Sequence, residues 1–179
     1  MNKTTYNPNT KIWSGPTVHP IYNTKLSLGQ LILSVLRQSP SKITQVSVEN
    51  EVKVSCYQMQ KRMVQIAKKL DEMGFKKGDI VGVNATNSEY LAPTVFACFA
   101  LGLPMNILAS SFDKSDIVHM YSKTRPKLVF CDSNIFDVVN ESLKEIGANS
   151  VMVTFCERVA GELFLEDFLV ETGNEDDYW

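Results

Sequence analysis

The strongest pattern in the chain lies in residues 78–155, GDIVGVNATNSEYLAPTVFACFALGLPMNILASSFDKSDIVHMYSKTRPKLVFCDSNIFDVVNESLKEIGANSVMVTF. Short apolar runs rich in β-branched residues alternate there with longer segments of helical periodicity. The runs predict strands at 80–83, 103–108, 127–131 and 150–155. Strands that alternate with helices form a parallel sheet through right-handed crossovers. The sequence therefore predicts an α/β fold, a parallel sheet flanked by helices.

The segments between these strands predict three helices. Residues 90–101 are apolar on nearly every side, which indicates a helix buried between layers, and Pro93 must lie in its first turn or kink it. The second helix begins near Ser111 or Asp113 and stops before Pro126, and the third follows the capping-type residues Asp132 and Ser133 and closes at Gly147. The apolar face of the third helix consists of Ile135, Val138, Val139, Leu143 and Ile146.

Upstream of the sheet, the pattern predicts an arm, a helix, a hairpin and a second helix. Residues 1–24 have no period and should run as an extended arm anchored by Trp13 and Ile21. Residues 25–38 form an amphipathic helix with Ser27 as N-cap. The alternation in residues 44–56 predicts a two-stranded hairpin turning at Glu49-Asn50, and residues 55–74 a helix with a Ser55/Gln58 capping box and Gly74 as its C-terminal cap.

The composition is that of an ordinary globular domain. The 179 residues are 44% hydrophobic and 21% charged, with a formal net charge of −2. No basic run exceeds two residues, so neither a nucleic acid nor an anionic membrane surface is an expected partner. The most apolar window, residues 91–109, contains Pro93, Gly102 and Pro104, which argue against a membrane span. The first thirty residues contain no signal-peptide core, so the default location is the cytoplasm.

The sequence has four cysteines: Cys56, Cys98, Cys131 and Cys156. Each lies among apolar residues, and none has a second cysteine or a histidine at the spacing typical of zinc ligands. We expect them to be reduced core residues rather than zinc ligands.

The familiar catalytic motifs are missing from the sequence. It contains no GxGxxG, GxxxxGK[ST], HExxH or GxSxG. Its two histidines, His19 and His119, are expected to be surface residues, since no nucleophile or orienting group accompanies them. Ligands of such sheets bind at the carboxyl ends of strands, here the loops 84–88, 109–111 and 132–133. We assign no catalytic, cofactor-binding or metal-binding residue.

The order of several short motifs resembles the start of the adenylate-forming enzymes, which include acyl-CoA synthetases, coumarate-CoA ligases and insect luciferases. The resemblance covers about residues 26–179. It rests on the helix start at Tyr57-Gln58, on residues 74–88 and 100–106, and on the strand entry at 123–130. The residues IWSGP at 12–16 are similar to the luciferase-like branch.

The resemblance implies an ATP-dependent ligase that converts a fatty or aromatic carboxylic acid to an acyl-adenylate and then to its CoA thioester. ATP, Mg²⁺ and CoA are implied for the full-length family and none for this chain alone. The family's phosphate loop, acidic ATP-binding motif and catalytic lysine lie later in its chains. We therefore expect an N-terminal portion truncated before the phosphate loop and inactive alone, with an arm at 1–24, a partial ligase domain at 25–170 and an acidic linker at 171–179.

Two other interpretations stay open. The chain could be a regulatory module that pairs with a full-length ligase, or a stand-alone doubly wound nucleotide-binding domain that uses the loop 84–88. Because family members pack the first helix and hairpin against later sequence, we also expect exposed apolar surface, poor solubility or self-association. The apolar residues expected to be exposed are Leu31, Ile32, Val35, Val46, Val48 and the helix near 95–101. A peroxisomal location would require a C-terminal targeting tripeptide on a longer form.

Overall fold

The computed structural model describes residues 4–16, 21–48 and 51–178. Its centre is a parallel sheet of five strands in the order β6-β5-β7-β8-β9. The sheet strands are β5 (Val81–Asn84), β6 (Met105–Leu108), β7 (Leu128–Asp132), β8 (Val151–Phe155) and β9 (Leu163–Phe164). The predicted α/β class with a helix-flanked parallel sheet is confirmed. The short strand β9 was not predicted.

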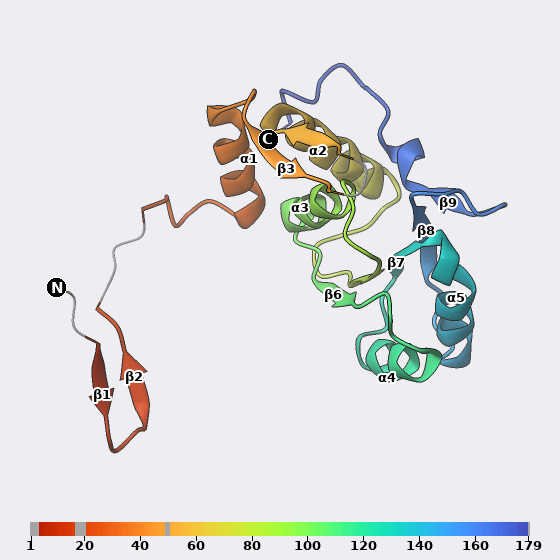
Figure 1. Cartoon of the computed structure of the whole chain (residues 1–179), viewed down its shortest axis with the longest axis horizontal. Helices are drawn as coiled ribbons and strands as arrows, with labels where there is room; N and C mark the ends of the chain where they lie inside the picture. The colour runs from red at the N-terminus through yellow and green to blue at the C-terminus, as the bar shows by residue number, and fades with distance from the viewer. Residues whose placement is uncertain (1–3, 17–20, 49–50, 179) are drawn as a thin grey trace.

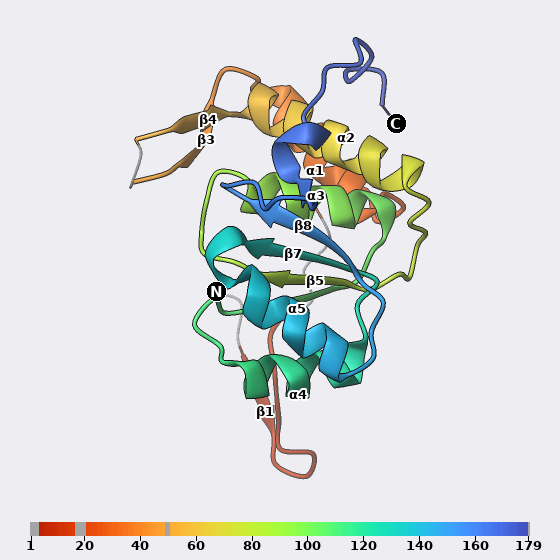
Figure 2. The same cartoon turned by 90° about the vertical axis from the view of Figure 1, so that its right-hand side faces the viewer.

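Helices cover both faces of this sheet (Figures 1 and 2). The helices are α1 (Leu28–Gln38), α2 (Cys56–Glu72), α3 (Leu91–Leu101), α4 (Lys114–Thr124) and α5 (Phe136–Glu145), with short 3-10 turns η1 (Ser133–Ile135) and η2 (Leu165–Phe168). Figure 2 shows α3 between the sheet and the pair α1 and α2, while α4 and α5 lie on the opposite face. None of the helices in the described ranges is long and apolar enough to cross a membrane.

The strands are apolar on both faces because each face meets a helical layer. One core joins Val83, Phe130 and Phe155 to α2 and α3, and the rings of Phe130 and Phe155 stack with their centroids 5.5 Å apart. The other core joins Val129 to α4 and α5 through residues that include Tyr121. Alternate residues along each strand therefore enter different cores.

Local capping signals place the early helices as predicted. Ser27 caps α1 and Ser55 caps α2, and in both cases the glutamine three residues later completes a capping box. Gly74 has a left-handed backbone, with φ of +88°, just after α2. Pro93 lies in the first turn of α3, where the absence of its N–H costs no hydrogen bond.

The N-terminal arm is not irregular throughout. The strands β1 (Thr5–Asn7) and β2 (Ile12–Ser14) pair in antiparallel fashion, and the Asn7 side chain accepts hydrogen bonds from the amides of Asn9 and Thr10. Figure 1 shows this hairpin standing away from the sheet. Trp13 and Ile21 are 69% and 86% exposed. The prediction that these two residues anchor an extended arm is therefore wrong.

The second predicted hairpin is present as β3 (Ile43–Val46) and β4 (Lys53–Ser55), an antiparallel pair. Its predicted turn at Glu49-Asn50 lies outside the described residues. On either side of these residues, the amide of Ser47 donates to the carbonyl of Val52 over 2.8 Å.

The start of α5 differs from its prediction. The 3-10 turn η1 intervenes, and α5 begins at Phe136 after Ile135, which provides no side-chain cap. Asp132 does not cap the helix because its carboxylate accepts hydrogen bonds from Thr86. Val138 is 39% exposed, so the predicted apolar face is also wrong at that position.

The acidic C-terminal residues lie on α2 and α1. Glu171 forms an ion pair with Lys61, and Lys68 donates to Thr172 and Asn174. Further along, the carboxylate of Asp176 accepts from Gln60, and Arg37 donates to the Asp176 carbonyl. Residues 171–178 therefore lie along the polar face of α2, although α2 precedes them by about a hundred positions in the chain.

An apolar groove of about 290 Å³ lies beside α1. It is lined by Tyr22, Leu31, Ile32, Val35, Leu36, Thr44 and Phe96. Val35, Val46 and Val48 are exposed, as predicted, whereas Leu31 and Ile32 are only partly exposed. The buried Ala97 and Cys98 show that α3 is largely covered, although Phe99 is 36% exposed.

Replacement of Gly29 should detach α1 from α3. A Cβ atom at Gly29 would lie 2.9 Å from the Ala100 nitrogen and closer still to the Ala100 Cα. Helix propensity favours alanine by about 1 kcal/mol, but overpacking against backbone costs about 1–3 kcal/mol. We expect Gly29→Ala to lower the free energy of unfolding in urea by up to about 2 kcal/mol, the overpacking cost less the gain in helix propensity. Gly15→Ala, which meets no atom within 4 Å, is the control, and equal stability of the two variants would contradict the packing argument.

Acid should weaken the C-terminal turn. The backbone amide of Thr172 donates to Glu175 and is the main cause that lowers the pKa of Glu175 to about 2. Because this folded-state pKa lies below the unfolded value, the carboxylate stabilises the fold above about pH 4.5 and loses that contribution as the pH falls toward 2. Urea unfolding should show Glu175→Gln less stable than the unaltered chain near neutral pH, with the difference shrinking in acid. Glu51→Gln, at an exposed position, should show no such trend.

Candidate functional site at the carboxyl edge of the sheet

The loops that follow β5, β6 and β7 meet at one edge of the sheet. The Thr86 amide and hydroxyl each donate to Asp132 Oδ2 over 2.8 Å, and Asn84 Nδ2 donates to the Ala109 carbonyl over 2.7 Å. These contacts join the loops 84–88, 109–111 and 132–133, which the sequence placed at the carboxyl ends of strands. Whether they form a binding site stays a prediction.

Asn84 and Asp132 leave the sheet on opposite faces. Asn84 pairs in register with Cys131, one position before Asp132, and side chains alternate between faces along a strand. Asn84 is fully buried and Asp132 is 7% exposed, and the Oδ1 atom of each is a buried acceptor that receives no hydrogen bond from the residues that the structure describes. The edge therefore presents two separate polar positions rather than one cluster.

The hairpin β3–β4 also borders this edge of the sheet, which the sequence did not indicate. Gln45 Nε2 donates to the Ser88 carbonyl over 3.0 Å. A cavity of about 240 Å³ lies between the hairpin and the loop, lined by Gln45, Val46, Ser47, Val48, Asn87 and Ser88. The partners are 43 positions apart, so no local pattern could have predicted this contact.

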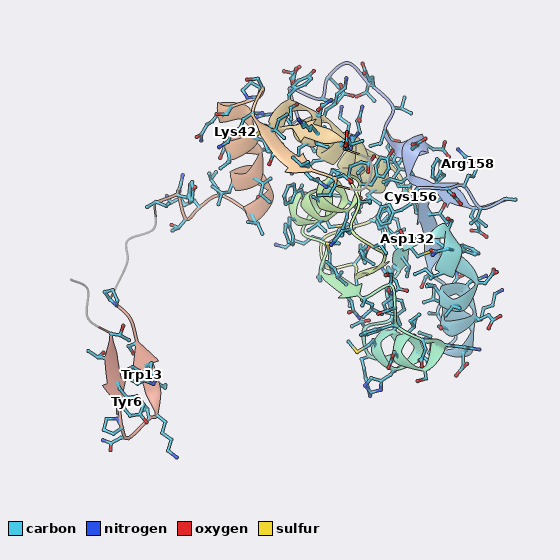
Figure 3. The ribbon with its side chains drawn as sticks, in the orientation of Figure 1. Tyr6, Trp13, Lys42, Asp132, Cys156 and Arg158 are labelled. Atoms are coloured by element: carbon cyan, nitrogen blue, oxygen red, sulfur yellow. The ribbon has the colours of Figure 1, made fainter. Side chains whose placement is uncertain are left out.

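Cys156 also lies at this edge. It follows β8 with φ of +60° and is exposed, in contrast to the buried Cys56, Cys98 and Cys131. The prediction of four core cysteines is therefore wrong at Cys156. Figure 3 shows it close to Asp132. Partial burial, followed by the nearby carboxylates of Asp132 and Glu89, raises the pKa of the Cys156 thiol, so the thiol stays protonated and is a poor nucleophile at neutral pH.

The described residues supply little that could hold a triphosphate or its metal ion. Asp132 and Glu89 give this edge negative charge, whereas phosphoryl chemistry needs hydrogen-bond donors and cations around the phosphates. Within residues 4–16, 21–48 and 51–178 no three His, Cys, Asp or Glu side chains are grouped as metal ligands. His119 is exposed on α4, as predicted, and His19 lies outside the described residues. The negative charge at this edge therefore does not fit ATP phosphates without further cationic groups.

Loss of the Thr86 hydroxyl should destabilise the edge. Valine keeps the shape of threonine but removes one of the two donors to Asp132 Oδ2. We expect Thr86→Val to lower the free energy of unfolding by about 1–2 kcal/mol, because a hydrogen bond to a charged group contributes more to stability than one between neutral groups. Thr24→Val, at an exposed position, is the matched control. Equal urea midpoints for the two variants would show that the Thr86–Asp132 contact adds no stability.

Two known proteins are similar in sequence to part of this chain. The sequence is 26% identical over 132 residues to Probable acyl-activating enzyme 21 of Arabidopsis thaliana and 24% identical over 110 residues to Acyl-CoA synthetase 7 of Caenorhabditis elegans. These matches cover 71% and 61% of this chain. The chain spans 24% and 20% of the length of these two relatives.

Two solved structures show the same fold. The luciferase-like enzyme of the mealworm Zophobas morio superimposes with a TM-score of 0.84 at 19% identity, over 90% of this chain and 38% of that one. A benzoate CoA ligase of Burkholderia xenovorans superimposes with a TM-score of 0.71 at 10% identity, over 80% of this chain and 28% of that one. The family model described as AMP-binding enzyme matches residues 34–174. Because that match takes in the hairpin β3–β4 and all five strands of the sheet, this chain belongs to the AMP-binding enzyme family.

Proposed function

We propose that this chain forms the N-terminal part of the catalytic domain of an ATP-dependent carboxylate–CoA ligase. The observation that carries the proposal is the family match over residues 34–174, which includes the whole parallel sheet. The names of the two relatives, an acyl-activating enzyme and an acyl-CoA synthetase, support ligase chemistry. Both relatives are about four to five times longer than the part that this chain spans.

The proposed reaction has two steps. A carboxylate oxygen attacks the α-phosphorus of ATP, which gives an acyl-adenylate and releases pyrophosphate. The thiol of CoA then attacks the acyl carbon, which gives the thioester and releases AMP. Fatty or aromatic acids are the proposed substrate class. Structural neighbours named as ligases of benzoate and anthranilate support the aromatic alternative, and one named as a putative long-chain-fatty-acid CoA ligase supports the fatty alternative.

The proposed contribution of these residues is the scaffold rather than the phosphate chemistry. The sheet edge carries negative charge around Asp132, which opposes the approach of a triphosphate. We therefore propose that residues 1–179 alone do not form the acyl-adenylate. The regulatory-module and stand-alone nucleotide-binding interpretations stay predictions, as do self-association and a cytoplasmic or peroxisomal location.

Pyrophosphate exchange tests the proposal. An antibody raised against the peptide of residues 56–77 would capture the native protein from an extract of its source, and the 179-residue chain would be purified in parallel. ATP–pyrophosphate exchange is then measured with hexadecanoate, benzoate and no added acid. We expect acid-dependent exchange from the captured protein and none from the 179-residue chain, because on this proposal the phosphates are bound by residues outside these 179.

Free peptide of residues 56–77, added during capture, is the matched control and should abolish the exchange signal. Captured protein that supports no exchange with either hexadecanoate or benzoate would refute its assignment as a ligase of fatty or aromatic acids. Exchange by the 179-residue chain would instead refute only the proposal that it is inactive alone.

A further inference from the structure

The C-terminal segment carries a charge pattern that the ligase proposal does not use. Glu175, Asp176 and Asp177 form the only run of three consecutive acidic residues in the sequence. Thr172 precedes this run by three positions, and no other serine or threonine has acidic residues at the third, fourth and fifth positions after it.

Exposure and the acidic run together distinguish Thr172 from the other serine and threonine residues that precede an acidic residue by three positions. Residues 171–178 contain no helix or strand, and the side chain of Thr172 is exposed. Four other serine and threonine residues have an acidic residue three positions later: Thr86, Ser110, Ser142 and Thr154. Ser142 and Thr154 are fully buried, in α5 and β8, and Ser110 is half-buried. Thr86 is exposed but is followed by Tyr90 and Leu91 at the fourth and fifth positions. Glu175 is buried in the folded turn, so a kinase that binds an extended segment requires residues 171–178 to leave α2, but it does not require the sheet or the helices to unfold.

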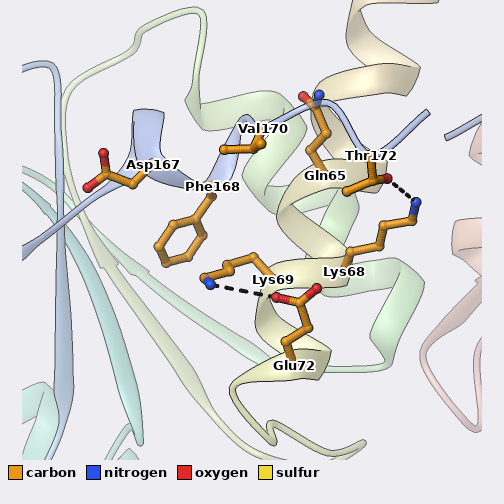
Figure 4. A pocket seen from close by; sticks show the side chains of 8 residues that line it. All are labelled: Gln65, Lys68, Lys69, Glu72, Asp167, Phe168, Val170 and Thr172. Atoms are coloured by element: carbon orange, nitrogen blue, oxygen red, sulfur yellow. Dashed lines mark hydrogen bonds and ion pairs between the residues drawn. The ribbon is translucent and has the colours of Figure 1, made fainter. Parts of the chain in front are cut away.

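The surroundings of the Thr172 hydroxyl are cationic on one side and anionic on the other. Lys68 Nζ donates to Thr172 Oγ1 over 2.7 Å, and Thr172 Oγ1 donates to Glu175 Oε1 over 2.9 Å. Next to the hydroxyl is a pocket of about 270 Å³ whose lining includes Lys68, Lys69 and Thr172 (Figure 4). Lys69 forms an ion pair with Glu72 in this pocket. The pocket offers space and two ammonium groups beside the threonine.

We propose that Thr172 is a phosphorylation site for an acidophilic protein kinase, one whose basic substrate groove is complementary to Glu175, Asp176 and Asp177. In this step Thr172 Oγ1 bonds to the γ-phosphorus of ATP while the bond from that phosphorus to the bridging oxygen of the β-phosphate breaks. The hydroxyl proton passes to the catalytic carboxylate of the kinase, and ADP leaves. Charge complementarity between groove and segment supplies the specificity.

The modification changes the contacts of the segment. A phosphothreonine cannot donate to Glu175, and its negative charge repels that carboxylate, so the turn between residues 172 and 175 opens. The phosphate is attracted to Lys68 and Lys69 in the pocket. Asp176, which accepts from Gln60 and whose carbonyl accepts from Arg37, then loses the turn that holds it against α2 and α1.

The test is phosphate transfer from radiolabelled ATP to the 179-residue chain by a purified acidophilic kinase. We expect incorporation approaching one phosphate per chain, located at Thr172 by peptide mass spectrometry. Thr172→Ala should lower incorporation at least about tenfold, and so should the triple variant Glu175→Gln, Asp176→Asn, Asp177→Asn, which keeps the acceptor but removes the recognition charges. Thr24→Ala is the matched control and should be phosphorylated like the unaltered chain.

Undiminished incorporation in Thr172→Ala, or phosphate found at Thr86, Ser142 or Thr154 instead of Thr172, would overturn the proposal. Absence of incorporation into the unaltered chain would do the same. A second readout is deuterium exchange of residues 173–178, which should become faster in the phosphorylated chain. Unchanged exchange would refute the release of the segment from α2 and α1.

Discussion

Burial of β5 and β7 on both faces is the constraint on which the rest of the structure depends. Every residue of these two central strands is buried. Such strands cannot exist without a helical layer on each side, because their apolar side chains point alternately up and down. The packing of α3 beneath α1 and α2, and of α4 and α5 opposite, follows from that requirement.

Close packing at the centre also limits which side chains fit. The site of Gly82 shows this, because a Cβ atom there would lie 2.8 Å from the Tyr121 hydroxyl.

The parts of the fold that could be predicted are those with local signals. The capping boxes at Ser55 and Ser27 and the apolar runs of the sheet lie within a few residues of the elements they specify. The hairpin β1–β2 was missed because its strands are only three residues long, although the turn-forming side chain of Asn7 was a usable signal. Very short strands leave no room for a period of two to appear.

The edge of the sheet could be located from the sequence but its contacts could not. Asp132 was assigned to a helix cap, the local role of an aspartate after a strand, whereas its partner Thr86 is 46 positions away. The link between Gln45 and Ser88, and the binding of Glu171 to Lys61, are similarly distant in sequence. Side-chain contacts between remote segments depend on the finished packing, so composition and periodicity contain no record of them. The exposure of Cys156 could not be predicted for the same reason, because it follows from the left-handed backbone after β8.

The two-residue strand β9 has a consequence for behaviour in concentrated solution. It pairs only with Val153 and Thr154, yet it occupies the outer side of β8, whose last four residues are buried. An uncovered edge of that composition would offer a template for pairing with strands of other molecules. Because β9 is short and the turn η2 follows it directly, it presents almost no row of free backbone donors and acceptors with which a strand of another molecule could pair. On this side, the sheet is protected against growth into an intermolecular ribbon by the brevity of its last strand.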